Sequence, residues 1–384
     1  MQIRHVSHEA QGGWSHPLPT ELDSASTLVL AFGPPATAAA EPALRELARA
    51  FPSSVHMACS SAGEIAGGQV NDDSVSVAVT RFEHTRLQRA ATQLDGVADS
   101  LAAGARLASQ LAAPDLRAVF LLSPGVNVNG AALVKGLRDQ LGSGVVVTGG
   151  LAGDGPRFQN TWVLNDGAPA PAGVAAVGLY GTALRVGHGC DGGWQDFGPE
   201  RRITRSDGPV LYELDGQPAL ALYKTYLGDL ANRLPGSGLL FPLSVHADEP
   251  GAPTLVRTIL AVDEEAQSLT FAGDMPQGAI ARLMRTSVDR LVDSAESAVG
   301  QALSQTGRTE GGGSPVLAVS VSCIGRRLLM GERTEEEVEA VADRLPPGSA
   351  HTGFYSYGEI APGAGAVCAD LHNQTMTVTV MAED

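Results

Sequence analysis

Apolar residues along the chain fall into two kinds of pattern. Short continuous runs, such as 27–32 and 118–122, predict buried strands. Longer stretches with apolar residues at every third or fourth position, such as 130–141 and 286–303, predict amphipathic helices. Because strands and helices alternate along most of the chain, the pattern predicts an α/β (mixed α+β) protein with mixed sheets covered by helices.

Two further signals concern where helices begin. Pro42 is expected in the first turn of the helix after the first strand, since the missing N–H of proline has no partner to lose there. Thr334 and Glu337 have the spacing of a capping box, in which each side chain bonds the other residue's backbone N–H. The sequence therefore predicts helices that open at these two points.

Two segments of eight residues are nearly identical. Residues 61–68 read SAGEIAGG and residues 356–363 read SYGEIAPG, with six of the eight positions the same. A weaker third copy, LAGDG, occupies 151–155. Because each copy follows a helix and then a strand, chance is a poor explanation, and the chain is predicted to have two related halves built from strand–helix–strand units.

Each copy has a glycine followed by an acidic residue at its centre. In a structural interpretation, the glycine supplies a positive φ angle and the carboxylate accepts hydrogen bonds from the turn. In a functional interpretation, the polar side chains of the copies converge on a ligand cleft between units. The candidate ligand-binding residues are Ser61, Glu64, Asp154, Ser356 and Glu359.

Length, charge and cysteine content limit the number of domains, the kinds of binding partner and the cellular location that are expected. The 384 residues predict about two to three domains, and the formal net charge of −16 repels nucleic acid and anionic membrane surfaces. No apolar run approaches the ~18 residues that span a bilayer, and no signal peptide is evident. The four cysteines lie far apart, which is typical of reduced thiols, so a cytoplasmic location is expected.

Common enzyme motifs are missing from the chain, including phosphate-binding loops and zinc-protease helices. Residues 59–63, CSSAG, come near a nucleophile elbow but lack its first glycine. A hydrolase or transferase that uses Ser61 or Cys59 is thus one alternative. It requires a general base within hydrogen-bond reach of the nucleophile.

His188 stands between two glycines, at the start of a glycine-rich stretch that extends to residue 216. Small neighbours leave an imidazole open, as an axial ligand of haem or a metal requires. Cys190 is on the same side of an extended chain and is a second candidate ligand or redox partner. Arginines suited to haem propionates or another anion are Arg185, Arg201 and Arg202. The alternative is a loop histidine bonded to backbone.

Several motifs in the second half of the chain carry a family resemblance. They are GW at 193–194, FGP at 197–199, ITRS at 203–206, VLYELDG at 210–216, CIGRR at 323–327, GFYSYGEIA at 353–361 and LHNQT at 371–375. Together they resemble the FIST family (F-box and intracellular signal transduction). The resemblance implies a FIST N domain at 27–203 and a FIST C domain at 204–384.

The resemblance implies a non-enzymatic sensory protein that binds a small molecule or gas. In the NosP-type members the ligand is nitric oxide, sensed by haem b, and the output is a separate histidine kinase or cyclic-di-GMP enzyme. His188 would then be the haem ligand, and signalling would occur in trans, with a homodimer left open. The alternative within the family is a sensor of a small organic ligand such as an amino acid, without haem.

Overall fold

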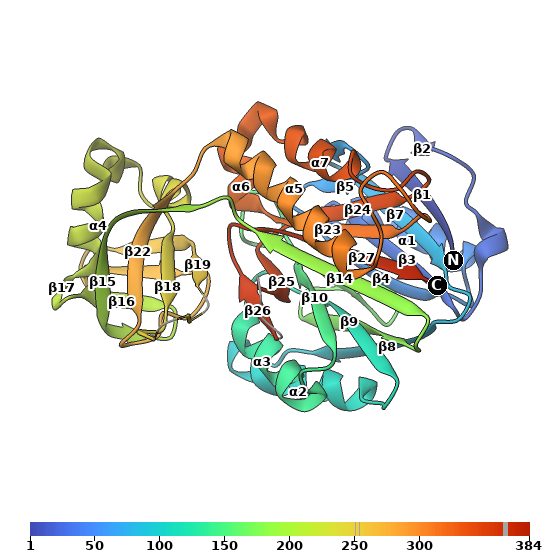
Figure 1. Ribbon diagram of the computed structural model, residues 1–384, viewed down its shortest axis with the longest axis horizontal. Coiled ribbons are helices and arrows are strands. Elements are labelled where there is room, and N and C mark those ends of the chain that lie inside the picture. The colour runs from blue at the N-terminus through green and yellow to red at the C-terminus, as the bar shows by residue number, and fades with distance from the viewer. Residues whose placement is uncertain (250, 253, 364–367) are drawn as a thin grey trace.

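The computed structural model describes residues 1–249, 251–252, 254–363 and 368–384, and shows a body and a separate lobe (Figure 1). Residues 195–285 form the lobe, which is inserted between two elements of the body. The expected domain division at 203/204 falls within the first strand of the lobe. In the described part of the chain no helix is long and apolar enough to cross a membrane.

The body contains the same four-stranded arrangement three times in its described residues. In each unit a parallel pair of strands, joined by one helix or in the third unit by two, is extended by two antiparallel strands. The first unit comprises β1 (Gln2–Glu9), β3 (Thr27–Gly33), α1 (Thr37–Ala50), β4 (Val55–Ser60) and β7 (Ser74–Arg81). The second comprises β8 (Arg86–Gln93), α2 (Ser100–Leu111), β9 (Leu116–Ser123), α3 (Gly130–Leu141), β10 (Val146–Leu151) and β13 (Gly173–Tyr180). The third comprises β14 (Leu184–Asp191), α5 (Val288–Gln305), β23 (Leu317–Cys323), α6 (Ile324–Met330), α7 (Glu335–Ala342), β24 (Ala350–Ser356) and β27 (Met376–Glu383).

Each unit also sends a small hairpin into the sheet of another unit. These hairpins are β5–β6 (Glu64–Ala66 and Gln69–Asn71), β11–β12 (Val163–Asn165 and Ala168–Ala170) and β25–β26 (Gly358–Pro362 and Ala369–His372). β5 of the first unit pairs with β24 of the third, β25 of the third pairs with β10 of the second, and β11 of the second pairs with β4 of the first. The exchange is therefore cyclic, and the mixed α+β class is confirmed.

The inner faces of the sheets share one core. Phe32 from the first unit stacks on Phe354 from the third with ring centroids 4.7 Å apart, and Phe120 from the second unit belongs to the same buried cluster. All seven residues of β3 and of β23 are buried. Burial on both faces explains why these strands read as continuous apolar runs and not as alternating patterns.

Helix α5 lies directly against strand β14. A Cβ atom added to Gly187 would lie 1.9 Å from the carbonyl oxygen of Ala302, and one added to Gly189 would lie 1.8 Å from that of Ala298. Real atoms do not approach so closely, so only glycine admits the helix backbone at these positions. The two glycines are therefore packing residues.

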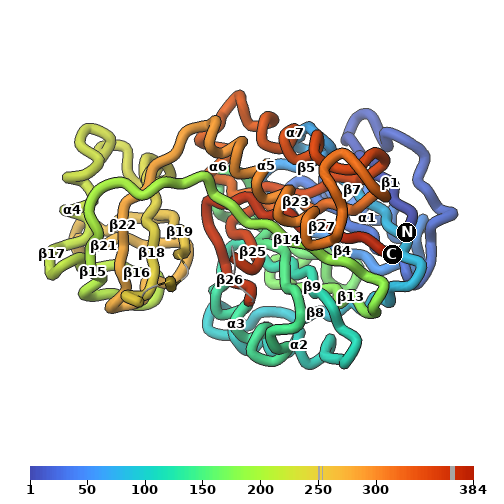
Figure 2. Tube along the Cα trace, in the orientation of Figure 1, coloured from blue at the N-terminus to red at the C-terminus, as the bar shows by residue number. Residues whose placement is uncertain are grey.

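The lobe is an antiparallel sheet with a core of its own. Its elements are β15 (Gln195–Asp207), β16 (Val210–Leu214), β17 (Gln217–Pro218), α4 (Ala219–Leu227), η4 (Gly236–Leu240), β18 (Leu243–His246), β19 (Leu255–Arg257), β20 (Ile259–Asp263), β21 (Ser268–Phe271) and β22 (Ile280–Arg285). Figure 2 shows the green and orange segments that connect it to the body. The Thr286 hydroxyl in one connection donates to the Gly193 carbonyl in the other at 2.8 Å. The lobe is thus connected to the body by two chain segments that are hydrogen-bonded to each other.

The helix pattern was confirmed at α3, which spans 130–141 as predicted, and at α7, which begins directly after Thr334; the predicted start at Pro42 and the predicted capping box were wrong. Helix α1 begins at Thr37, and Pro42 lies inside it, because the alanine run at 38–40 has high helix propensity and starts the helix before the proline. Thr334 makes no capping bond. Glu337 is instead fully buried and paired with Arg326, with oxygen–nitrogen distances of 2.6 and 3.0 Å.

We expect Gly189→Ala to lower the free energy of unfolding by ~2 kcal/mol or more, because α5 must move away from β14 to admit the methyl group. Urea denaturation monitored by circular dichroism measures the change. Gly144→Ala is the matched control, since an added Cβ there meets nothing within 4 Å. Equal stabilities for the two variants would contradict the packing role.

Candidate functional site

The twin turns found in the sequence each hold a buried carboxyl in the same way. The Ser61 hydroxyl donates to Glu64 Oε1 at 2.6 Å, and the backbone N–H and hydroxyl of Ser74 donate to Oε2 at 3.2 and 3.1 Å. In the other copy Ser356 and Thr375 make the same bonds to Glu359, at 2.6, 3.1 and 2.9 Å. Each carboxyl therefore ties the start of an exchanged hairpin to the strand that follows it.

This arrangement favours the structural interpretation of the turns. Burial raises the pKa of both Glu64 and Glu359 to about 7, although their hydrogen bonds act in the opposite direction. The turn backbones meet, since Ala62 N–H donates to the Tyr355 carbonyl at 2.8 Å and Gly153 N–H to that of Ser60 at 3.2 Å. Yet both glutamates bond residues of their own units, so the structure does not bring the carboxyls together.

Asp154, the acid of the weaker copy, has different partners. Its carboxylate accepts hydrogen bonds from the backbone N–H groups of Phe158, Gln159 and Asn160 at 2.8, 3.1 and 2.8 Å. It also accepts a bond from the hydroxyl of Tyr357, which belongs to the third unit. Asp154 thus fixes a loop of its own unit and contacts a neighbouring turn.

Ser61 and Glu64 line a cleft of about 630 Å³, but the site lacks the features of a hydrolase. Within the described ranges no histidine is hydrogen-bonded to Ser61, whose oxygen accepts from Gly63 N–H at 2.9 Å and donates to Glu64. Cys59 is fully buried, and burial raises the pKa of its thiol well above the ordinary range. The same serine–glutamate bond at Ser356 marks the pair as a recurring structural device.

His188 lies within strand β14 and not in a loop. Because Gly187 and Gly189 face α5, its side chain points to the opposite face of the strand. Burial lowers the pKa of the imidazole, and in the described part of the chain its nitrogens have no hydrogen-bond partner. A neutral imidazole of this kind retains the chemistry of a metal ligand.

Of the other residues predicted to surround a haem, Cys190 lies on the same face of β14 as His188, but the arginines are not gathered there. Burial raises the pKa of Cys190 to about 12, so its sulfur stays a thiol. Arg185 is paired with Asp384 at 2.6 Å, while Arg201 and Arg202 belong to the lobe and pair with its acids. These arginines do not fit the role of propionate partners beside His188. Among the described residues no cluster of three His, Cys, Asp or Glu side chains could hold a metal ion.

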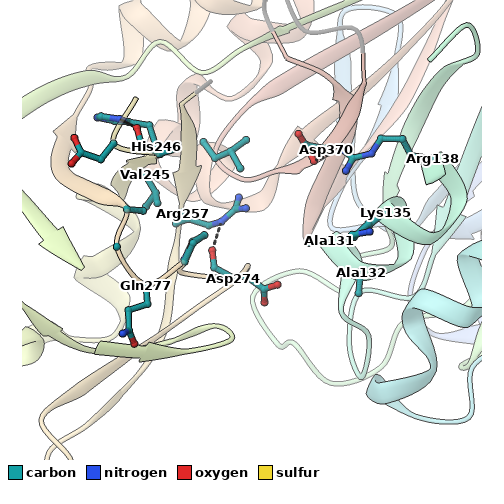
Figure 3. A pocket seen from close by; sticks show the side chains of 16 residues that line it. Ala131, Ala132, Lys135, Arg138, Val245, His246, Arg257, Asp274, Gln277 and Asp370 are labelled. Carbon is teal, nitrogen blue, oxygen red and sulfur yellow. Dashed lines mark hydrogen bonds and ion pairs between the residues drawn. The ribbon is translucent and has the colours of Figure 1, made fainter. Parts of the chain in front are cut away.

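A cleft of about 680 Å³ separates the lobe from the body (Figure 3). The lobe contributes Arg257 and Asp274 to its lining, and the body contributes Lys135, Arg138 and Asp370 from α3 and β26. Arg138 is paired with Asp370 at 3.1 Å, and Lys135 with an acid on its own helix. The cleft therefore combines charges of both signs.

Arg257 differs from these surface cations because it is only 4% exposed. Its guanidinium donates to the carbonyl oxygens of Asp274 at 3.2 Å, Leu371 at 3.2 Å and Val256 at 3.4 Å. No carboxylate lies within ion-pair distance of it in the part of the chain that the structure describes. Burial lowers its pKa to about 10, so it remains charged at neutral pH.

Sequence reasoning missed Arg257 and Asp274. Neither lies in a repeated turn or in a glycine-flanked segment, and they meet only because β19 and the loop after β21 are neighbours in the lobe. The arginine-rich composition was the one available signal, and it does not separate a buried arginine from the many exposed ones. The structure was needed to find this site.

We expect the free energy of unfolding to fall as pH rises from about 4.5 to about 7. Glu64 and Glu359 have raised pKa values in the folded state, so folding favours their protonated forms, and this stabilisation is lost as they ionise. Each carboxyl contributes up to about 3 kcal/mol of this change.

Urea denaturation at pH 5.5 and pH 8 tests this dependence. The double variant Glu64→Gln/Glu359→Gln should show a smaller difference between the two pH values than the parent. The exposed Glu265→Gln is the control and should leave the difference unchanged. A parent protein with equal stability at both pH values would contradict the expectation.

The FIST N domain matches residues 27–217 and the FIST C domain matches residues 219–362. Among solved structures, the chain is similar to cyanuric acid hydrolase from A. caulinodans, with 10% identity, 100% of this chain and 99% of that chain covered, and a TM-score of 0.40. It is also similar to PurLQS from Thermotoga maritima, with 9% identity, 78% and 72% covered, and a TM-score of 0.21. No curated protein matches the sequence. The protein therefore belongs to the FIST family, whose domains are sensory, ligand-binding modules of signal transduction.

Proposed function

We propose that this chain senses a small zwitterionic organic molecule of the α-amino acid class, bound in the cleft between lobe and body. The observation that carries the proposal is Arg257, a buried guanidinium that lines the cleft and contacts backbone carbonyls where a carboxylate would be expected. Buried charges in proteins are normally paired. A ligand carboxylate would supply the opposite charge, and the planar guanidinium suits its geometry.

The same cleft has a place for an ammonium group. Asp274 lines the cleft next to Arg257, and among the described residues its carboxylate has one distant partner, the amide of Asn129 at 3.5 Å. A ligand with a carboxylate and an ammonium group would meet both charges of this pair. This favours a zwitterion over a simple anion.

The position of the cleft suggests how binding becomes a signal. Its two walls belong to parts of the molecule joined by 191–195 and 285–288, so a ligand that contacts both walls favours a closed arrangement. The lobe touches the body through Arg257 at the Leu371 carbonyl and through Leu239, whose carbonyl accepts from Gln374 at 3.1 Å. A changed lobe position would present a different surface to a separate signalling partner, such as a histidine kinase.

We expect Arg257→Gln to weaken binding of an amino acid by at least about tenfold, because a charge-assisted hydrogen bond to the carboxylate is lost. A thermal-shift screen of the standard amino acids identifies a binder, since a ligand of the native state raises the melting temperature. Isothermal titration calorimetry then compares the variants. Arg205→Gln, on the lobe and outside the cleft, is the matched control.

Asp274→Asn separates the two charges. Asp274→Asn should weaken binding of the amino acid, but not binding of the corresponding carboxylic acid that has no amino group. Arg257→Gln should weaken binding of both molecules. Circular dichroism establishes that each variant is folded. If neither substitution changes the affinity of an amino acid that binds the parent protein, the ligand binds elsewhere and the proposed site is wrong.

A haem-dependent nitric-oxide sensor is the second candidate, and the observation that favours it is the imidazole of His188, whose pKa burial lowers and whose nitrogens bond none of the described residues. Haem would supply the iron that binds the gas, and His188 would hold it. We expect haem-reconstituted protein to show a Soret band that shifts with nitric oxide and is lost in His188→Ala. A spectrum unchanged by that substitution removes His188 from the role, and His84→Ala, at an exposed histidine between β7 and β8, is the control.

A further inference from the structure

The cleft continues into a smaller compartment of about 200 Å³ that is mainly apolar. Phe158 and Tyr357 stack on its body side with ring centroids 4.1 Å apart and an angle of 14° between the planes. Leu260 and Phe271 line its lobe side. The compartment therefore lies between the same two parts of the molecule as the charged cleft.

Phe158 is held in an unfavourable backbone conformation that exposes its ring. Its φ angle is 53°, in the left-handed region that bulky residues rarely occupy. The Asp154 carboxylate and the Tyr357 hydroxyl fix the loop by accepting from Phe158 N–H at 2.8 and 3.1 Å. Strained conformations that the surroundings enforce are concentrated at functional sites.

Exposed apolar side chains gather at this compartment. Seven large apolar residues are exposed in the described part of the chain, and three of them line it: Val97 at 51%, Phe158 at 38% and Leu260 at 42%. Single exposed apolar residues need no explanation, but a cluster inside a cleft indicates a binding surface.

The apolar compartment adjoins the charges proposed to bind the ligand. Asp274 lines both spaces. Gly273 lines the smaller one, and a Cβ added to it would lie 2.9 Å from the guanidinium carbon of Arg257. One molecule whose charged end contacts Arg257 and Asp274 thus has the apolar compartment directly beside it.

We infer that the ligand is an aromatic amino acid whose ring stacks on Phe158; this inference rests on the proposed function. An apolar cavity of about 150 Å³ admits a benzene ring, so the compartment has room for one. An exposed ring face favours a planar partner, because stacking adds about 0.5–1.5 kcal/mol to the effect of apolar burial. An aliphatic side chain would gain the burial alone.

Calorimetry with L-phenylalanine and L-leucine as probes tests the inference. The parent protein should bind phenylalanine more tightly than leucine, and both affinities should depend on Arg257. Phe158→Leu, which keeps an apolar surface but removes the ring, should weaken phenylalanine about three- to tenfold and leave leucine nearly unchanged. Leu101→Ala, at an exposed apolar residue outside the compartment, is the control.

The outcomes separate the two proposals. Arg257-dependent binding of leucine as tight as that of phenylalanine would overturn the aromatic inference and leave the proposed function standing. Phenylalanine binding that Phe158→Leu does not change would also overturn it. If neither probe binds and no amino acid raises the melting temperature, the proposed function itself fails, and the aromatic inference fails with it.

Discussion

The exchange of hairpins between units is the constraint on which the rest of the body depends. Each unit completes the sheet of a neighbour, so no unit can form its full set of strand pairs alone. Strand edges left open invite pairing with other chains, and the cyclic exchange covers one edge of each sheet within the molecule. The Ser–Glu bonds at Glu64 and Glu359 act where the chain leaves one sheet for another. They explain why a buried acid, costly by itself, occurs twice in the same sequence context.

Because its units complete one another's sheets, the body is a rigid support for the lobe. The connection at 191–195 is bonded to it on both sides: the Gly192 carbonyl accepts from Arg326 at 3.1 Å, and the Trp194 indole donates to the Gln374 carbonyl at 2.7 Å. Arg326 is itself fixed by the fully buried Glu337. Motion is therefore expected in the position of the lobe and not within the body. A ligand held between the two would act on that position, as a sensory function requires.

The strands, most helices and the repeat could be predicted from the sequence, because these depend on local periodicity. The partners of the repeated glutamates could not be predicted, since Ser74 and Thr375 lie 10 and 16 residues away and no local rule links them. The glycines beside His188 show a different limit: a glycine admits either a ligand or a packed helix, and only the position of α5 decides between them. Thr334 and Glu337 match the capping pattern, but burial next to Arg326 gave the glutamate another partner. Arg257 lies in none of the motifs or periodic patterns that marked the other candidate residues.

The weaker third copy of the turn is where structure and proposed function meet. In two copies the acid bonds the strand that follows the hairpin, whereas the shorter Asp154 bonds a loop that presents Phe158. Its other partner, Tyr357, directly follows Ser356 of the third unit's turn, so the presented loop is bonded to a hairpin that another unit supplies. A ligand that stacked on Phe158 would thus press on the junction between two units. The same turn thus fixes a strand in two places, and in the third it holds an exposed ring.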